Sequence, residues 1–225
     1  LLSRGLGDVY KRQLQFIKNE IKYPFYISKQ FIDAIFSDKP KITRNKILSS
    51  PFIGIVYGMY ATNTQRGGIT TIQCEKIYNE HFFIQITGNQ GDIMKESVHC
   101  AKTVAWNRLT NDLRKKIRQD QKSNKWGLHL HCPDTSTPKD GPSAGAAIAI
   151  SMLSVFKQKY VRNNIAITGE IDIKGNVKKI GGLRSKIDGS KKEGIDTFIY
   201  PSENQDDIDL ITKNNPVFTK NIKLI

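Results

Sequence analysis

Apolar residues alternate with other residues from position 53 to 59, where Ile53, Ile55, Tyr57 and Met59 occupy every second place. Side chains at this period of two share one face of a β-strand. Two further segments have strand-like composition and are bounded by turn residues. They are Thr71–Ile77 and Phe82–Thr87, with turns at Arg66–Gly68 and Asn79–Glu80. The spacing predicts an antiparallel meander over residues 53–87.

The apolar spacing then becomes helical. From Asp92 to Arg118 apolar residues recur every three or four positions, which predicts one long helix with an apolar face. A polar loop is expected over residues 119–126, followed by a short strand at Leu128–Cys132. In that strand His129 and His131 point to the side opposite the apolar residues.

The last third of the chain alternates between helical and strand-like segments. The predicted elements are a helix at Ser143–Gln158, strands at Ile165–Ile171 and Thr197–Tyr200, a short strand ending at Ile180, and helices at Leu183–Glu193 and Asp206–Lys213. Together with the meander, these elements predict an α+β fold in which helices pack on mixed sheets.

The first part of the chain is different in character. Residues 14–40 have a helical apolar pattern interrupted by prolines, and residues 38–51 are a polar connector. We therefore divide the chain into a lead-in at 1–45 and a main domain at 46–225. No segment is long and apolar enough to span a membrane, so no membrane partner is expected.

Composition narrows the function classes. The formal net charge is +14, which suits either nucleic-acid binding or a solvated lysine-rich surface. The densest basic run, Arg114–Arg118, falls at the end of a predicted helix, where cations complement the helix dipole. The three cysteines are few and widely spaced and form no C-x-x-C, which argues against zinc and favours a reducing, intracellular compartment.

Ser143 follows the turn residues Gly141 and Pro142 and opens a predicted helix. A side chain at that point lies beside unpaired backbone N–H groups, which can stabilise a developing oxyanion. The small residues Ala144–Ala147 allow another backbone to approach closely. The same residues also suit an ordinary helix cap, because serine is a common N-cap.

Lys186 lies on the predicted helix Leu183–Glu193 at positions that share a face with Leu183 and Ile187. Burial on this apolar face would lower the pKa of the amine and leave it able to accept a proton from a serine. The alternative is that the Lys186 stem lies along apolar surface and its ammonium reaches water. Sequence spacing alone does not show whether Ser143 and Lys186 meet.

Several segments together resemble the proteolytic domain of Lon proteases. The matching segments are Asp140–Gly145, Thr168–Ile171, Lys174–Val177, Ile180–Lys186 and, further upstream, Gly91–Ser97. The interval between Ser143 and Lys186 also suits the serine–lysine dyad of that family. The resemblance extends from about residue 51 to the end and implies a Lon-type α+β proteolytic domain.

The resemblance implies roles for the matching positions. Ser143 is then the nucleophile that forms an acyl-enzyme, and Lys186 is the general base and later the general acid. Thr168 holds the Lys186 amine by its hydroxyl, and backbone N–H groups near Ser143 form the oxyanion hole. The supporting residues are Thr168, Asp140, His129 and His131. No metal is implied.

The resemblance also implies partners. Substrates are expected to be unfolded or damaged polypeptides, degraded in a ring that is usually a hexamer, in the cytoplasm or the mitochondrial matrix. The chain has no G-x-x-x-x-G-K-[ST] motif, so ATP and Mg are expected for a full-length protein and no cofactor for this chain. Residues 1–45 are then the tail of a missing ATPase module. A non-catalytic scaffold and a nucleic-acid-binding module are the alternatives.

Overall fold

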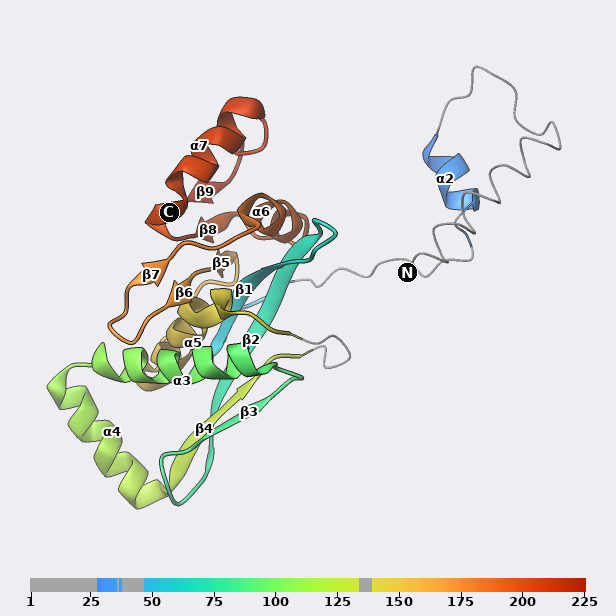
Figure 1. Ribbon diagram of the computed structural model, residues 1–225. Helices are drawn as coiled ribbons and strands as arrows, with labels where there is room; N and C mark the ends of the chain where they lie inside the picture. The colour runs from blue at the N-terminus through green and yellow to red at the C-terminus, as the bar shows by residue number, and fades with distance from the viewer. Residues whose placement is uncertain (1–27, 36, 38–46, 134–138) are drawn as a thin grey trace. The chain divides into compact units, whose positions relative to one another are not determined.

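A computed structural model describes residues 28–35, 37, 47–133 and 139–225. The chain divides between Thr43 and Arg44 into two units (Figure 1). The described part of the first unit contains helix α2, Lys29–Ile35, which lies within the predicted helical lead-in. The rest of that lead-in, apart from Ser28 and Ser37, and most of the predicted connector fall outside the described residues.

The described residues of the second unit form a mixed sheet of seven strands in the order β3-β4-β2-β1-β5-β8-β9 (Figure 1). Its strands are β1 (Ile55–Ala61), β2 (Gly67–Tyr78), β3 (Ile84–Thr87), β4 (Trp126–His131), β5 (Ile165–Ile167), β8 (Thr197–Ile199) and β9 (Lys223–Leu224). A separate two-stranded sheet pairs β6 (Glu170–Ile171) with β7 (Val177–Lys178). The predicted α+β class with mixed sheets is therefore confirmed.

The predicted meander is half right. Strands β1 and β2 pair antiparallel, with Tyr57 opposite Thr71. Strand β3 does not pair with β2 but lies at the sheet edge, parallel to β4, with Ile86 opposite Leu130. Strand β4 takes the antiparallel place beside β2 instead. Alternation fixes which side chains share a face, but it leaves the partner strand open.

The predicted single helix at 92–118 is wrong. The chain forms α3, Asp92–Asn107, and after a corner a second helix α4, Asn111–Asn124. Thr110 caps α4, because its side chain accepts a hydrogen bond of 3.3 Å from the Leu113 N–H. Most of the predicted loop at 119–126 is therefore helical. The apolar residues keep a helical spacing across the corner. The spacing alone therefore gives no sign that one helix ends and another begins.

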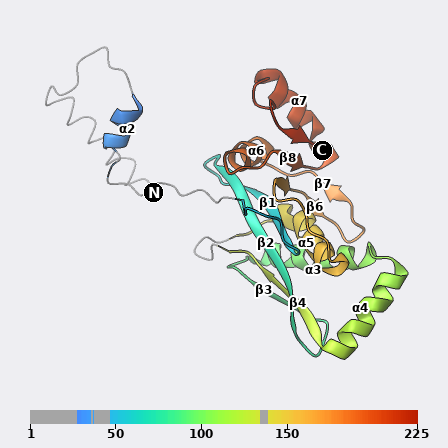
Figure 2. The ribbon, with the colours of Figure 1, turned by 180° about the vertical axis from the view of Figure 1, so that it is seen from behind.

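Helices cover both faces of the sheet (Figures 1 and 2). Helices α3 and α5 (Gly145–Lys157) pack on one face, and α6 (Leu183–Lys192) and α7 (Gln205–Asn214) contribute to a second apolar cluster. Strand β1 feeds both clusters, since Val56 belongs to the α5 side and its neighbour Tyr57 to the α6 side. Among the described residues, every helix is too short or too polar to cross a membrane.

Candidate active site

Ser143 lies on the 3-10 turn η1, Pro142–Ala144, which leads directly into α5. The predicted helix at 143–158 therefore starts with a tighter turn. Gly141 precedes this turn with φ +128, a conformation that glycine adopts readily. A Cβ on Gly145 would lie 2.8 Å from Ile171 Cγ2, so β6 approaches α5 as closely as the run of small residues predicted.

The backbone of Ser143 is bound to the segment that follows β5. Its carbonyl accepts hydrogen bonds from the Gly169 N–H at 2.8 Å and from the Thr168 hydroxyl at 3.2 Å. The Thr168 N–H continues the sheet by donating to Ile199 at 3.0 Å, and the chain then leaves the sheet to reach Ser143. The strand predicted at 165–171 is therefore interrupted at Thr168–Gly169, because Gly169 bonds to η1 instead of to β8.

Lys186 is buried on α6, with 4% of its surface exposed. Leu183, Ile187 and Ser190 on the same helix face are also buried, as their spacing predicted. The helix lies very close to β2, because a Cβ on Gly189 would be 1.9 Å from the carbonyl carbon and oxygen of Gly67. This close approach fixes the depth at which the Lys186 side chain enters the domain.

Three side chains converge where these segments meet. Lys186 Nζ lies 2.9 Å from Ser143 Oγ and 3.1 Å from Thr168 Oγ1. The amine reaches Ser143 from the α6 side of the sheet, whereas α5 presents the serine from the other side. Burial lowers the pKa of Lys186 from 10.5 to about 8, since desolvation disfavours the ammonium form.

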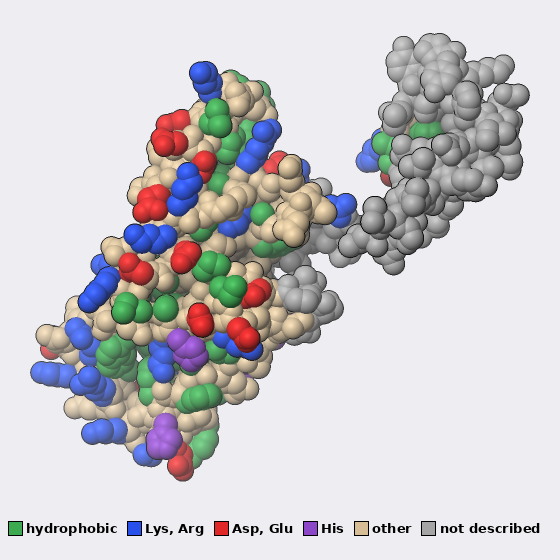
Figure 3. Space-filling model, viewed as in Figure 1, with side chains coloured by type: hydrophobic (Ala, Val, Ile, Leu, Met, Phe, Trp, Pro, Cys, Tyr) green, Lys and Arg blue, Asp and Glu red, His purple; other side chains and the backbone are tan. Residues whose placement is uncertain are grey.

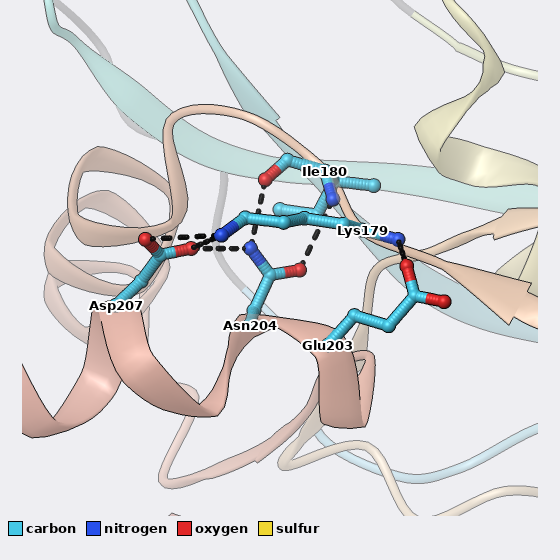
Figure 4. Close-up of polar contacts among 5 residues, drawn as sticks. All are labelled: Lys179, Ile180, Glu203, Asn204 and Asp207. Carbon is cyan, nitrogen blue, oxygen red and sulfur yellow. Dashed lines mark hydrogen bonds and ion pairs between the residues drawn. The ribbon is translucent and has the colours of Figure 1, made fainter.

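The chain entering α6 is held by a polar cluster at the start of α7 (Figure 4). The Asn204 side chain accepts from the Ile180 N–H at 3.0 Å and donates to the Ile180 carbonyl at 2.9 Å and to Asp207 at 2.6 Å. Next to it, Lys179 contacts Asp207 at 3.3 Å, and its N–H donates to Glu203 at 2.9 Å. Because Asn204 is fully buried, these bonds fix the segment that leads into α6.

The other predicted supporting residues form their hydrogen bonds with groups other than the Ser143 and Lys186 side chains in the described part of the chain. Asp140 accepts hydrogen bonds of 3.0 Å from the Met94 and Gly141 N–H groups, so its carboxylate caps the first turn of α3. His129 Nε2 and His131 Nδ1 both contact Thr87 Oγ1, at 2.8 and 2.7 Å. No group of three or more potential metal-ligating side chains occurs among the residues that the structure describes.

Sequence reasoning missed the residues that position Lys186. The sequence places Gly67 in a predicted turn and Gly189 within a predicted helix, and neither pattern links the two residues. A glycine inside a helix costs stability, so its presence was a signal of close packing. Asn204 offered no such signal, because its partner Ile180 lies far away in the sequence, in the segment between β7 and α6.

Comparison with known proteins gives the family. The sequence model of the Lon protease (S16) C-terminal proteolytic domain matches residues 27–221. The Lon protease homolog of Acanthamoeba polyphaga mimivirus is 38% identical over 84% of this chain and 19% of its own length. The Lon protease of Borrelia duttonii is 36% identical over 92% of this chain and 25% of its own length.

A mitochondrial relative gives the same result. The mitochondrial Lon protease homolog of Saccharomyces cerevisiae is 35% identical over 78% of this chain and 15% of its own length. The chain thus spans a quarter or less of the length of these relatives. The family match covers most of the sequence, and the chain belongs to the Lon protease family as a C-terminal proteolytic domain.

Proposed function

We propose that this chain is a serine endopeptidase in which Ser143 attacks the scissile carbonyl and Lys186 is the general base. The observation that carries the proposal is the 2.9 Å separation of Lys186 Nζ and Ser143 Oγ in a buried setting. A base at hydrogen-bond distance from a nucleophile, oriented by a third group, is the common arrangement of nucleophilic catalysis.

Thr168 orients the Lys186 amine. The Thr168 hydroxyl donates its single proton to the Ser143 carbonyl, so its lone pairs are left to accept from Lys186 Nζ. A neutral amine has two N–H bonds and one lone pair. With one N–H directed to Thr168, the lone pair can face Ser143 Oγ and accept its proton as the oxygen attacks.

The reaction then proceeds through an acyl-enzyme. The Ser143 oxygen bonds to the substrate carbonyl carbon, and the proton passes to Lys186. The same ammonium returns that proton to the leaving amine when the peptide bond breaks. Backbone N–H groups of η1 support the oxyanion, because the first N–H groups of a helix have no acceptor within it. The Gly145 and Ala146 N–H groups that open α5 instead donate to the Pro142 and Gly169 carbonyls. Water then attacks the ester carbonyl. Lys186 takes a proton from this water and returns it to Ser143 Oγ as the ester bond breaks.

The wider role is also proposed from the family. The substrates are unfolded or damaged polypeptides, and the working particle is a ring, most simply a hexamer. ATP and Mg act on an ATPase module of the longer protein and require no site in these residues. The cytoplasm or mitochondrial matrix is the proposed compartment, in keeping with relatives named from bacteria and from mitochondria.

The proposal is tested by hydrolysis of an unstructured fluorogenic peptide. Ser143→Ala is expected to lower kcat/KM by about 10³-fold or more, because the nucleophile is lost. Ser123→Ala, a change at an exposed serine of α4, is the matched control and should leave hydrolysis unchanged. Equal hydrolysis by the parent protein and Ser143→Ala would favour the scaffold alternative.

A further inference from the structure

A cavity lies away from the proposed active site. It has a volume of about 280 Å³ and lies between α3, α4 and the loop that leads into β3. Its lining residues are Phe82, Trp106, Ile117, Arg118, Gln119, Gln121 and Lys122. None of Ser143, Thr168 and Lys186 contributes to it, so the proposed peptidase function gives this cavity no role.

The cavity has a rigid aromatic wall. The Phe82 ring lies 5.9 Å from Trp106, 5.5 Å from Trp126 and 6.1 Å from Phe156, measured between centroids. The loop that carries Phe82 is fastened to α4, because Gln121 donates to the Glu80 carbonyl at 3.3 Å. Aromatic rings held in this way give a preformed apolar surface with little freedom left to lose on binding.

The rim of the cavity is cationic. Arg118 and Lys122 are its only charged lining residues in the described part of the chain, and both are exposed. The same helix carries three further cations in Arg114, Lys115 and Lys116. Figure 3 shows Lys and Arg side chains gathered over the α4 region. The acid Asp120 on α4 is engaged by Lys76 at 2.8 Å, so the surface around the cavity favours an anionic partner.

We propose that this cavity binds an acidic peptide segment, with one bulky apolar side chain inserted against the aromatic wall and carboxylates facing Arg118 and Lys122. The volume is below the roughly 300–1,000 Å³ of pockets for drug-sized ligands, which suits a single side chain. An apolar anchor combined with flanking charges is the usual chemistry of a small peptide-docking site.

The ring contacts favour a peptide over a nucleic acid. Single-stranded nucleic acids bind by stacking their bases on exposed aromatic faces. Here Arg118 lies over the Trp106 ring at 5.5 Å, and Lys102 lies over the Phe82 ring at 4.8 Å. These cations occupy ring faces that a base would need, whereas an apolar side chain needs only the apolar lining of the cavity, which includes Phe82, Trp106 and Ile117.

Tryptophan fluorescence can test the proposal directly. The chain has 2 tryptophans, Trp106 on the cavity and Trp126 beside Phe82, so both report on this region. The probes are three blocked peptides: glutamates around a central Phe, glutamates around a central Ala, and lysines around a central Phe. We expect a saturable fluorescence change for the first and at least about fivefold weaker binding for the others.

A charge reversal supplies the matched control. Lys122→Glu is expected to weaken binding of the acidic Phe peptide by about fivefold or more, because a rim cation becomes an anion. Lys116→Glu makes the same change on the same helix at an exposed residue that does not line the cavity, and binding should fall much less. Binding by Ser143→Ala should equal that of the parent protein, which separates this site from the proposed active site.

Several outcomes would overturn the proposal. Equal binding of the Phe and Ala peptides would show that the cavity binds no apolar side chain. Equal losses of affinity in Lys122→Glu and Lys116→Glu would show only a general attraction to the protein's positive charge. Tighter binding of a poly(dT) oligonucleotide with the same fluorescence change would assign the surface to nucleic acid. Fluorescence that changes with protein concentration alone, together with dimers in sedimentation, would assign it to a second copy of the chain.

Discussion

The helix that follows Ser143 and the helix that carries Lys186 are anchored in different ways. Helix α5, which follows Ser143, has ten buried residues, most of them apolar, and packs on β1, β2 and α3. Helix α6, which carries Lys186, has five buried residues, and only Leu183 and Ile187 among them are large and apolar. Helix α5 is therefore fixed by apolar burial, whereas α6 depends on a close glycine contact and on the polar cluster around Asn204.

This difference has a consequence for the proposed chemistry. Loss of apolar volume under α5 lowers stability, but the Ser143 carbonyl remains tied to Thr168 and Gly169. A small shift of α6 against β2 changes the distance between Lys186 Nζ and Ser143 Oγ. Proton transfer is sensitive to that distance, so the lysine side of the site is where distant changes should reach catalysis.

The largest expected effect on stability comes from the α5 side. Met152 is fully buried, and Met152→Ala should lower the free energy of unfolding by about 2–5 kcal/mol. The folded fraction should nevertheless retain its kcat, because the change leaves Ser143 and its hydrogen bonds in place. Denaturant unfolding and kcat per folded molecule measure the two quantities. If Met152→Ala lowered kcat as much as a substitution on α6 does, the two helices would not differ in their effect on catalysis.

The second largest effect on stability is expected from a substitution on α6. A Cβ at Gly189 would overlap the backbone of Gly67, so Gly189→Ala should cost about 1–3 kcal/mol of stability and also lower kcat. Gly181→Ala is the matched control, because a Cβ there meets no atom within 4 Å. The comparison requires peptide hydrolysis and unfolding data for both variants. Normal kcat in folded Gly189→Ala would show that the close contact does not position Lys186.

A smaller effect is expected at Thr168. Thr168→Val removes the hydroxyl that accepts from Lys186 Nζ and should lower kcat about tenfold, with KM little changed. Thr168→Ser restores the hydroxyl and should recover most of the rate. Steady-state kinetics of the two variants separate orientation of the amine from packing. Equal rates for the Val and Ser variants would indicate a packing role alone.

The sequence predicted individual helix faces well. The spacing of Lys186 with Leu183 and Ile187 predicted its place on the apolar helix face but left open whether the ammonium reaches water, and the structure buries it. The predicted side alternation of His129 and His131 with their apolar neighbours is also observed. Helical and strand periods reflect which face of an element packs on the core. The buried face of a single helix or strand can therefore be derived from spacing.

Relations between elements could not be derived in the same way. The corner at Thr110 and the edge position of β3 both leave the apolar period unchanged. The meeting of Ser143 with Lys186 depends on how two helices from opposite faces of the sheet reach the end of β5. The family resemblance supplied that pairing as an expectation, and no periodicity contains it.

The most direct test of the central claim is the pH dependence of Ser143 acylation. The rate constant for adduct formation with an acylating serine-protease probe is measured by mass spectrometry from about pH 6 to about pH 10. Only the neutral amine can accept the serine proton, so the rate should rise with pH and level off above the Lys186 pKa of about 8. Lys186→Met should lose this profile. A rate still rising toward the ordinary lysine pKa, or an unchanged profile in Lys186→Met, would contradict a buried neutral Lys186 acting as the base.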